Sequence, residues 1–239
     1  MKSQPNGVVI WRGPSRFDRA PIFVAVTGLA RPTSNRKTGD MLQTWILAEH
    51  EPPTARGQYD TGTQPSACGR CPLGHGLCYV NWNAAPLSVW RRYRSEPVTD
   101  PRGVADGHAV RLGAAGDPAM VPVSVWRALL TGARSWTGYT HQAGQLDCRA
   151  LRPLLMRSTE TEEQTRRAWG QGWRTFRVRA RGAPLLAGEI NCPSRPGFPC
   201  ERCGLCRGTA VRGPSVSIEA HGSPVFAKAR NELLRGHHG

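Results

Sequence analysis

The chain has 239 residues and a formal net charge of +15, from 32 Lys and Arg against 17 Asp and Glu. It lacks both the roughly 18 consecutive apolar residues of a membrane helix and the apolar segment of a secretory signal, so we expect a cytoplasmic protein. Only Lys2, Lys37 and Lys228 are lysines. The remaining basic residues are arginines, which can donate two parallel hydrogen bonds to a phosphate. Nucleic acid or a nucleotide is therefore a candidate partner. A GC-rich genome, which enriches Arg, Gly and Pro together, would give the same composition.

Residues 1–66 are expected to contribute strands and loops to the core. Apolar, β-branched runs at 21–26 and 44–47 are typical of strands, and the polar stretch 31–40 between them is typical of a loop. A short helix is predicted to begin at 85–90, where a proline occupies the first turn.

Residues 67–223 alternate between strand and helix patterns. A helix pattern lies at 121–130, and strand patterns lie at 108–112, 136–140, 154–156, 175–178, 188–191 and 215–219. A second helix is predicted to run to about residue 170 from a capping box formed by Thr159 and Glu162. A last helix, 225–234, is predicted within the C-terminal segment 224–239. Strands that alternate with helices pair in parallel, so we predict an α/β fold built as a partial or complete TIM-like barrel.

Eight cysteines in a reducing compartment do not favour disulfides, and their clustering favours a bound metal. Seven of them fall into two clusters, the first with Cys68, Cys71 and Cys78 and the second with Cys192, Cys200, Cys203 and Cys206. The second cluster contains a C-x2-C-x2-C core, the spacing by which ferredoxin-like segments bind iron–sulfur clusters. Zinc sites more often pair two C-x2-C knuckles. We therefore expect Cys-rich metal-binding loops, with an iron–sulfur centre favoured over zinc.

Two arrangements of these thiols fit the pattern. Four thiolates from the second cluster would complete one iron–sulfur centre, while three from the first would leave one iron open for a substrate or cofactor. Alternatively, ligands from both clusters build a single site. Cys148 has no partner in spacing and is expected to be a buried free thiol.

Polar residues at the ends of predicted strands are candidate catalytic groups, because chemistry in parallel α/β folds gathers at the strand ends. They are Asp117, His141, Arg157, Arg177 and His221. In a single barrel these residues would converge on one mouth, beside Cys192. Asp117 also fits a turn cap, and His141 also fits a structural histidine.

Several strings resemble an uncharacterised phage-associated family of cysteine-rich proteins over residues 35–223. They lie at 37–41, 43–47, 78–80, 111–113, 116–118, 136–142, 172–178, 203–206 and 220–222. More distantly, a cysteine cluster that ends in Cys-Tyr, a strand that leads into Gly-Asp and a strand that ends in Tyr-Thr resemble radical-SAM-type phage proteins. That resemblance implies a partial TIM barrel on which Cys68, Cys71 and Cys78 hold a 4Fe–4S cluster with an open iron. S-adenosylmethionine (SAM) is then a candidate cofactor. The commonest motif of that family is C-x3-C-x2-C, whereas this chain has C-x2-C-x6-C.

These observations favour a cytoplasmic, radical-SAM-like iron–sulfur enzyme of phage origin that acts on a nucleotide or nucleic acid. A zinc-stabilised nucleic-acid-binding protein without catalysis is the alternative, with both cysteine clusters serving only to fold loops. A phage replication accessory that binds DNA without chemistry is a third.

Overall fold

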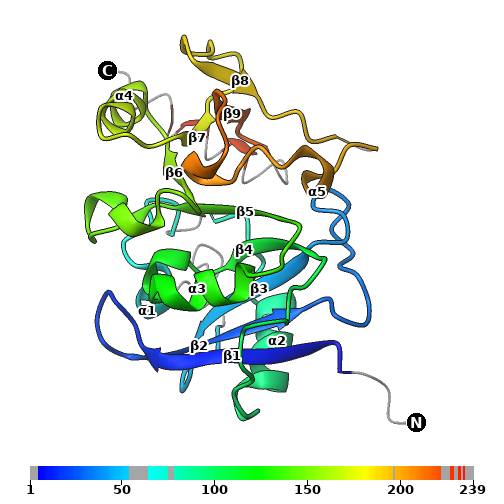
Figure 1. Ribbon diagram of the computed structural model, residues 1–239. Helices are drawn as coiled ribbons and strands as arrows, with labels where there is room; N and C mark the ends of the chain where they lie inside the picture. The colour runs from blue at the N-terminus through cyan, green and yellow to red at the C-terminus, as the bar shows by residue number, and fades with distance from the viewer. Residues whose placement is uncertain are drawn as a thin grey trace.

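The computed structural model describes residues 5–53, 64–74, 78–195 and 197–221, together with 227–228, 231–232 and 234. Its nine strands form one sheet in the order β1-β2-β3-β4-β5-β6-β7-β9-β8 (Figure 1). The strands are β1 (Gly7–Pro14), β2 (Pro21–Thr27), β3 (Leu42–Ala48), β4 (Ala109–Ala115), β5 (Ser135–Thr140), β6 (Met156–Thr159), β7 (Thr175–Arg179), β8 (Glu189–Asn191) and β9 (Ser215–Glu219). The N-terminal strands thus belong to the same sheet as the rest of the chain.

The sheet is mixed, mostly parallel and open. β1, β2 and β3 pair antiparallel, and every pair from β3·β4 to β8·β9 is parallel. The predicted α/β class with parallel pairing is confirmed. The complete barrel is not, because β1 and β8 are the two edges of the described sheet and do not pair with each other.

Short helices connect the parallel strands. They are α1 (Pro65–Cys68), α2 (Ala85–Tyr93), α3 (Val123–Leu130), α4 (Glu162–Gly170) and α5 (Cys200–Cys203), with 3-10 turns η1 (Pro118–Met120), η2 (Gln142–Gly144), η3 (Arg149–Leu151) and η4 (Gly208–Ala210). The predicted capping box of α4 has the right spacing but the wrong position. Thr161 and Gln164 form it, because the chain is still extended at Thr159, which pairs with Arg177 of β7. Of the predicted helix 225–234, residues 227–228, 231–232 and 234 are described and are helical, and the others lie outside the described residues.

The apolar core is unevenly distributed over the sheet. A large cluster joins β1–β5 to α2 and α3, with Phe23, Leu42 and Trp126 fully buried. A much smaller cluster of Met156, Cys206 and Val216 lies toward the other edge. The N-terminal half is therefore held by hydrophobic burial, and the C-terminal half depends more on polar contacts.

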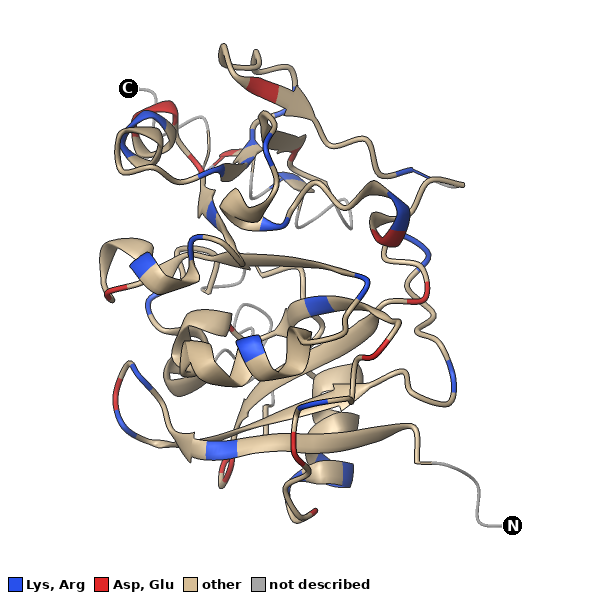
Figure 2. Ribbon diagram, in the orientation of Figure 1, with Lys and Arg blue, Asp and Glu red and all other residues tan. Residues whose placement is uncertain are grey.

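None of the helices in the described part of the chain is both long and apolar enough to cross a membrane. Basic residues lie on α2, α3, α4 and α5 and on several loops, rather than on one element (Figure 2). The net charge of +15 is thus spread over the fold.

Candidate functional site

The first cysteine cluster follows the carboxyl end of β3. Cys68 is the last residue of α1 and is buried, while Cys71 and Cys78 are partly exposed. Burial raises the pKa of the Cys68 thiol well above its usual value, and the adjacent charges of Cys71 and Cys78 raise it further. The Cys68 thiol therefore senses the charge of both other cysteines of the first cluster.

Gln142, directly after β5, fixes the backbone of this cluster. Its side-chain amide donates to the carbonyl of Cys68 at 2.9 Å and accepts from the Arg70 amide at 3.3 Å. Gly69 lies between these two contacts with φ of +59°, and a Cβ there would come within 2.3 Å of the Gln142 side-chain oxygen. A glycine is therefore needed for this close approach.

Asp117 joins the first cluster to the ends of β4 and β5. Its amide donates to the Ala67 carbonyl at 2.7 Å, and its carboxylate accepts from the amides of Ala119 and His141, each at 2.9 Å. Burial raises the pKa of Asp117, and these hydrogen bonds oppose that shift. The turn cap that the sequence offered as an alternative role for Asp117 is thus confirmed.

His141 lies between a thiol and a carboxylate. Its Nδ1 is 3.6 Å from the Cys71 Sγ, and its Nε2 is 2.7 Å from the Glu160 Oε1. Burial acts to lower the pKa of His141, but Cys71 and Glu160 outweigh it and raise the pKa well above its usual value. Glu160, at the end of β6, is a site residue that the sequence analysis missed, although its position after a strand is the same signal that selected His141.

The second cysteine cluster begins directly after β8 and runs through α5 to Cys206. Burial raises the pKa of Cys206 to about 12, and its nearby charges include Cys192, Cys200 and Cys203. The Cys206 carbonyl accepts from the Gly138 amide of β5 at 3.1 Å, which fixes this segment over the sheet. The Cys206 thiol therefore senses the charges of the other three cysteines of the second cluster.

A segment far away in the sequence supports α5. The Lys37 carbonyl accepts from the Cys200 amide at 2.8 Å, and the Asp40 amide donates to Glu201 at 2.7 Å (Figure 1). His221 lies here too, with its Nε2 2.9 Å from the Lys37 Nζ. The polar loop predicted at 31–40 is thus a brace for the second cluster, and His221 belongs to that brace.

Arg174 fixes the chain that leaves the second cluster. Its guanidinium donates to the carbonyls of Leu205, Gly208, Val211, Gly213 and Pro214 at 2.6–3.2 Å. Arg174 is 9% exposed. Backbone carbonyls that would otherwise be unpaired are satisfied by this one side chain.

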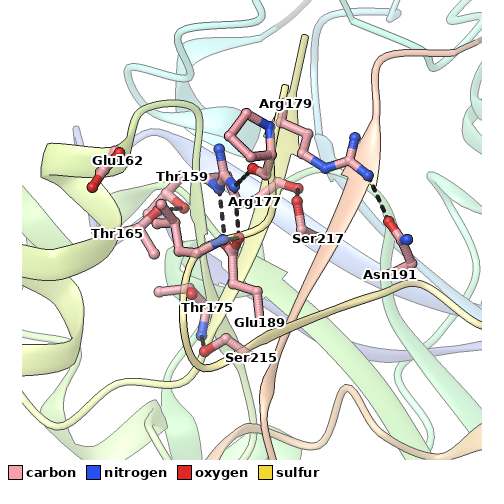
Figure 3. Close-up of polar contacts among 12 residues, drawn as sticks. Thr159, Glu162, Thr165, Thr175, Arg177, Arg179, Glu189, Asn191, Ser215 and Ser217 are labelled. Carbon is pink, nitrogen blue, oxygen red and sulfur yellow. Dashed lines mark hydrogen bonds and ion pairs between the residues drawn. The ribbon is translucent and has the colours of Figure 1, made fainter. Parts of the chain in front are cut away.

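Two predicted site residues lie elsewhere. Arg177 forms a buried ion pair with Glu189 at 2.6 Å (Figure 3). Arg157 donates to the Gln171 side chain at 2.6 Å. The structure brings Asp117 and His141 to the first cluster and His221 to the brace of the second, but it does not bring Arg157 or Arg177 to either. Alternate residues of a strand face opposite sides of the sheet, and the sequence did not reveal which side Arg177 faces.

Within the described residues, no three Cys, His, Asp or Glu side chains converge closely enough to hold one metal ion. A single zinc ion needs its ligands around one point, whereas each thiolate of an iron–sulfur cluster binds a different iron. Cysteine thiolates are soft ligands suited to either centre. The predicted metal-binding loops are therefore not shown by the described residues, and the iron–sulfur centre stays a prediction.

No protein-family model, curated protein or solved structure was found to match this chain. The function proposed below therefore depends on the chemistry of the two cysteine clusters.

Proposed function

We propose that the protein is a cytoplasmic, radical-SAM-like iron–sulfur enzyme of the phage-associated type, acting on a nucleotide or nucleic acid. One observation supports this most strongly. The first cysteine cluster begins at Cys68, whose neighbour Ala67 accepts a hydrogen bond from the Asp117 amide at 2.7 Å, directly beyond the end of β4. In this proposal the parallel strands from β3 onward form the wall of a partial barrel.

The donor set of the first cluster fits an iron–sulfur centre. Cys68 is a buried thiol that ionises with difficulty beside two other thiols, and a cationic cluster would compensate all three thiolates. Three protein ligands leave one iron of a four-iron cluster for an exogenous ligand. When bound, the cluster would supply electrons to SAM or to the substrate at that iron.

The surrounding side chains have separate tasks. Asp117 sets the position of Ala67 and His141 through its backbone and carboxylate, so it orients the loop that would hold the cluster. His141 and Glu160 form a hydrogen-bonded pair that can hold a proton next to Cys71. The second cluster has four thiols, enough to complete a closed centre without an open iron.

Anaerobic purification with iron and sulfide analysis tests this proposal. We expect a brown protein with sulfide in equal amount to iron, and loss of about half of both in Cys68→Ser. Cys148→Ser is the matched control, because Cys148 is buried and belongs to neither cluster. A colourless protein that holds zinc without sulfide would contradict the proposal and favour the zinc-stabilised nucleic-acid-binding alternative.

SAM binding is tested separately by equilibrium dialysis of the iron-loaded protein. We expect bound SAM to be lost in Cys68→Ser and retained in Cys203→Ser, since only the first cluster has an open iron. SAM bound equally by both variants would contradict this assignment.

A further inference from the structure

Arg111, in the middle of β4, lies between the two cysteine clusters. It donates to the hydroxyl of Tyr79 at 2.9 Å, next to Cys78 of the first cluster. Its charge also interacts with Tyr139 of β5 and with Cys200 of the second cluster. The hydrogen bond to Tyr79 places Arg111 beside the first cluster, and its charge also acts on Cys200 of the second.

The guanidinium of Arg111 has unused hydrogen-bonding capacity. An arginine carries five N–H donors, and the only side-chain acceptor for Arg111 among the described residues is the Tyr79 hydroxyl. In that part of the chain no Asp or Glu forms an ion pair with it, in contrast to Arg12 and Arg177. A partly buried arginine without a carboxylate partner is suited to bind an oxyanion in a fork.

Tyr79 adds an aromatic surface beside this cation. Its side chain is 59% exposed, the largest exposure among the large hydrophobic residues of the described chain. The Arg111 guanidinium carbon lies 5.9 Å from the centre of the Tyr79 ring. An exposed ring next to a cation can stack on a nucleobase while the cation binds its phosphate.

We infer that Arg111 and Tyr79 form the binding site for a phosphate-bearing nucleotide, held between the two cysteine clusters. The inference rests on the proposed function for its location beside the open iron. It narrows the substrate class to one with both an oxyanion and an aromatic base. SAM carries an adenine and a carboxylate, so the test includes SAM as a competing source of the anion.

Isothermal titration calorimetry with AMP, adenosine, inorganic phosphate and SAM tests the inference, on full-length protein whose iron is measured in the same preparation. We expect AMP to bind more tightly than adenosine. Arg111→Met should weaken AMP about tenfold or more, the loss expected for one charge-assisted hydrogen bond, and leave adenosine nearly unchanged. Arg127→Met is the matched control, because Arg127 is exposed on α3.

Tyr79 variants separate stacking from charge. Tyr79→Ala should weaken both AMP and adenosine, whereas Tyr79→Phe should retain most of the affinity for both. Because the ring is exposed, we expect these variants to fold, and circular dichroism checks this. Equal AMP affinity in wild type, Arg111→Met and Tyr79→Ala would overturn the inference.

Two further results would also overturn it. If Arg111→Met weakens SAM but not AMP, the oxyanion is the SAM carboxylate. The second result concerns iron. If Arg111→Met lowers the iron content, Arg111→Lys restores it, and AMP binds equally well to all three proteins, then Arg111 only compensates the charge of the thiolates. AMP binding that depends on Arg111 in a protein without iron would keep this inference and reject the cluster instead.

Discussion

The two cysteine clusters are built into the fold in different ways. The first is anchored in the large apolar core through Cys68, which is 8% exposed and packs in the cluster that includes β1–β5. The second lies over a small core of Met156, Cys206 and Val216 and is held by hydrogen bonds from Arg174 and the 37–40 segment. The apolar core around the first cluster holds the adjacent side chains in place. The position of the second cluster depends instead on each of its individual hydrogen bonds.

The neighbours of the clusters differ as well. Asp117, His141 and Glu160 gather at the first cluster, where a proton can be held or moved. At the second cluster, burial and the charge of Cys206 raise the pKa of Tyr139 well above its usual value, and the Arg174 guanidinium donates to backbone carbonyls. Under the proposed function, the first cluster would be the reactive one and the second would serve stability or electron storage.

The largest expected effect tests whether Arg177 is structural. Arg177→Met leaves Glu189, whose side chain is 0% exposed, without its cation. We expect a loss of about 3–5 kcal/mol in the free energy of unfolding, measured with urea, and unchanged iron per folded protein. The double variant Arg177→Met with Glu189→Leu should recover most of that stability. A loss of iron per folded protein in Arg177→Met would mean that Arg177 acts in the site after all.

Arg174→Met tests whether the second cluster depends on polar contacts. Several carbonyls lose their donor, so we expect a loss of roughly 2–3 kcal/mol in unfolding free energy. Iron should fall by about half, because only the second centre depends on this side chain. Arg212→Met, on the same loop but exposed, serves as the control. If Arg174→Met removed iron from both centres, the two clusters would form a single site.

Asp117→Ala tests whether the hydrogen bonds of Asp117 hold the first cluster in place. The variant removes the acceptor of the Ala119 and His141 amides, and a lost cap of this kind costs about 1–2 kcal/mol. Thermal unfolding measures the change. SAM binding should fall while the iron of the second cluster remains, and Asp117→Asn, which keeps an acceptor oxygen, should be milder in both respects. Equal effects of the two variants would show that the charge, rather than the hydrogen bonding, is important.

Lys37→Met should have the smallest effect. Lys37 supports α5 through its backbone carbonyl, which the substitution retains. We expect a change within about 0.5 kcal/mol in unfolding free energy, as for most surface substitutions, and full iron content. Loss of iron from the second cluster would instead show that the Lys37 ammonium beside His221 is required there.

The sequence by itself determined the α/β class, most of the strands and the grouping of the seven cysteines. These features depend on local patterns: alternating apolar residues, turn residues and short cysteine spacings, which act within a few residues of one another. It missed β1, whose run from Gly7 to Pro14 ends in proline and has no regular alternation. It also placed the α4 cap two residues early, since Thr159 and Thr161 offer the same spacing and only pairing with β7 distinguishes them.

Only the tertiary structure decided which distant residues meet. The strand order leaves the sheet open. Arg177 forms an ion pair with Glu189, whereas Arg111 contacts Tyr79 beside the first cysteine cluster. The contacts of His141 with Glu160 and of Lys37 with Cys200 join segments 19 and more than 160 residues apart. Such contacts depend on how strands pair and twist over the whole sheet, and no local pattern records them.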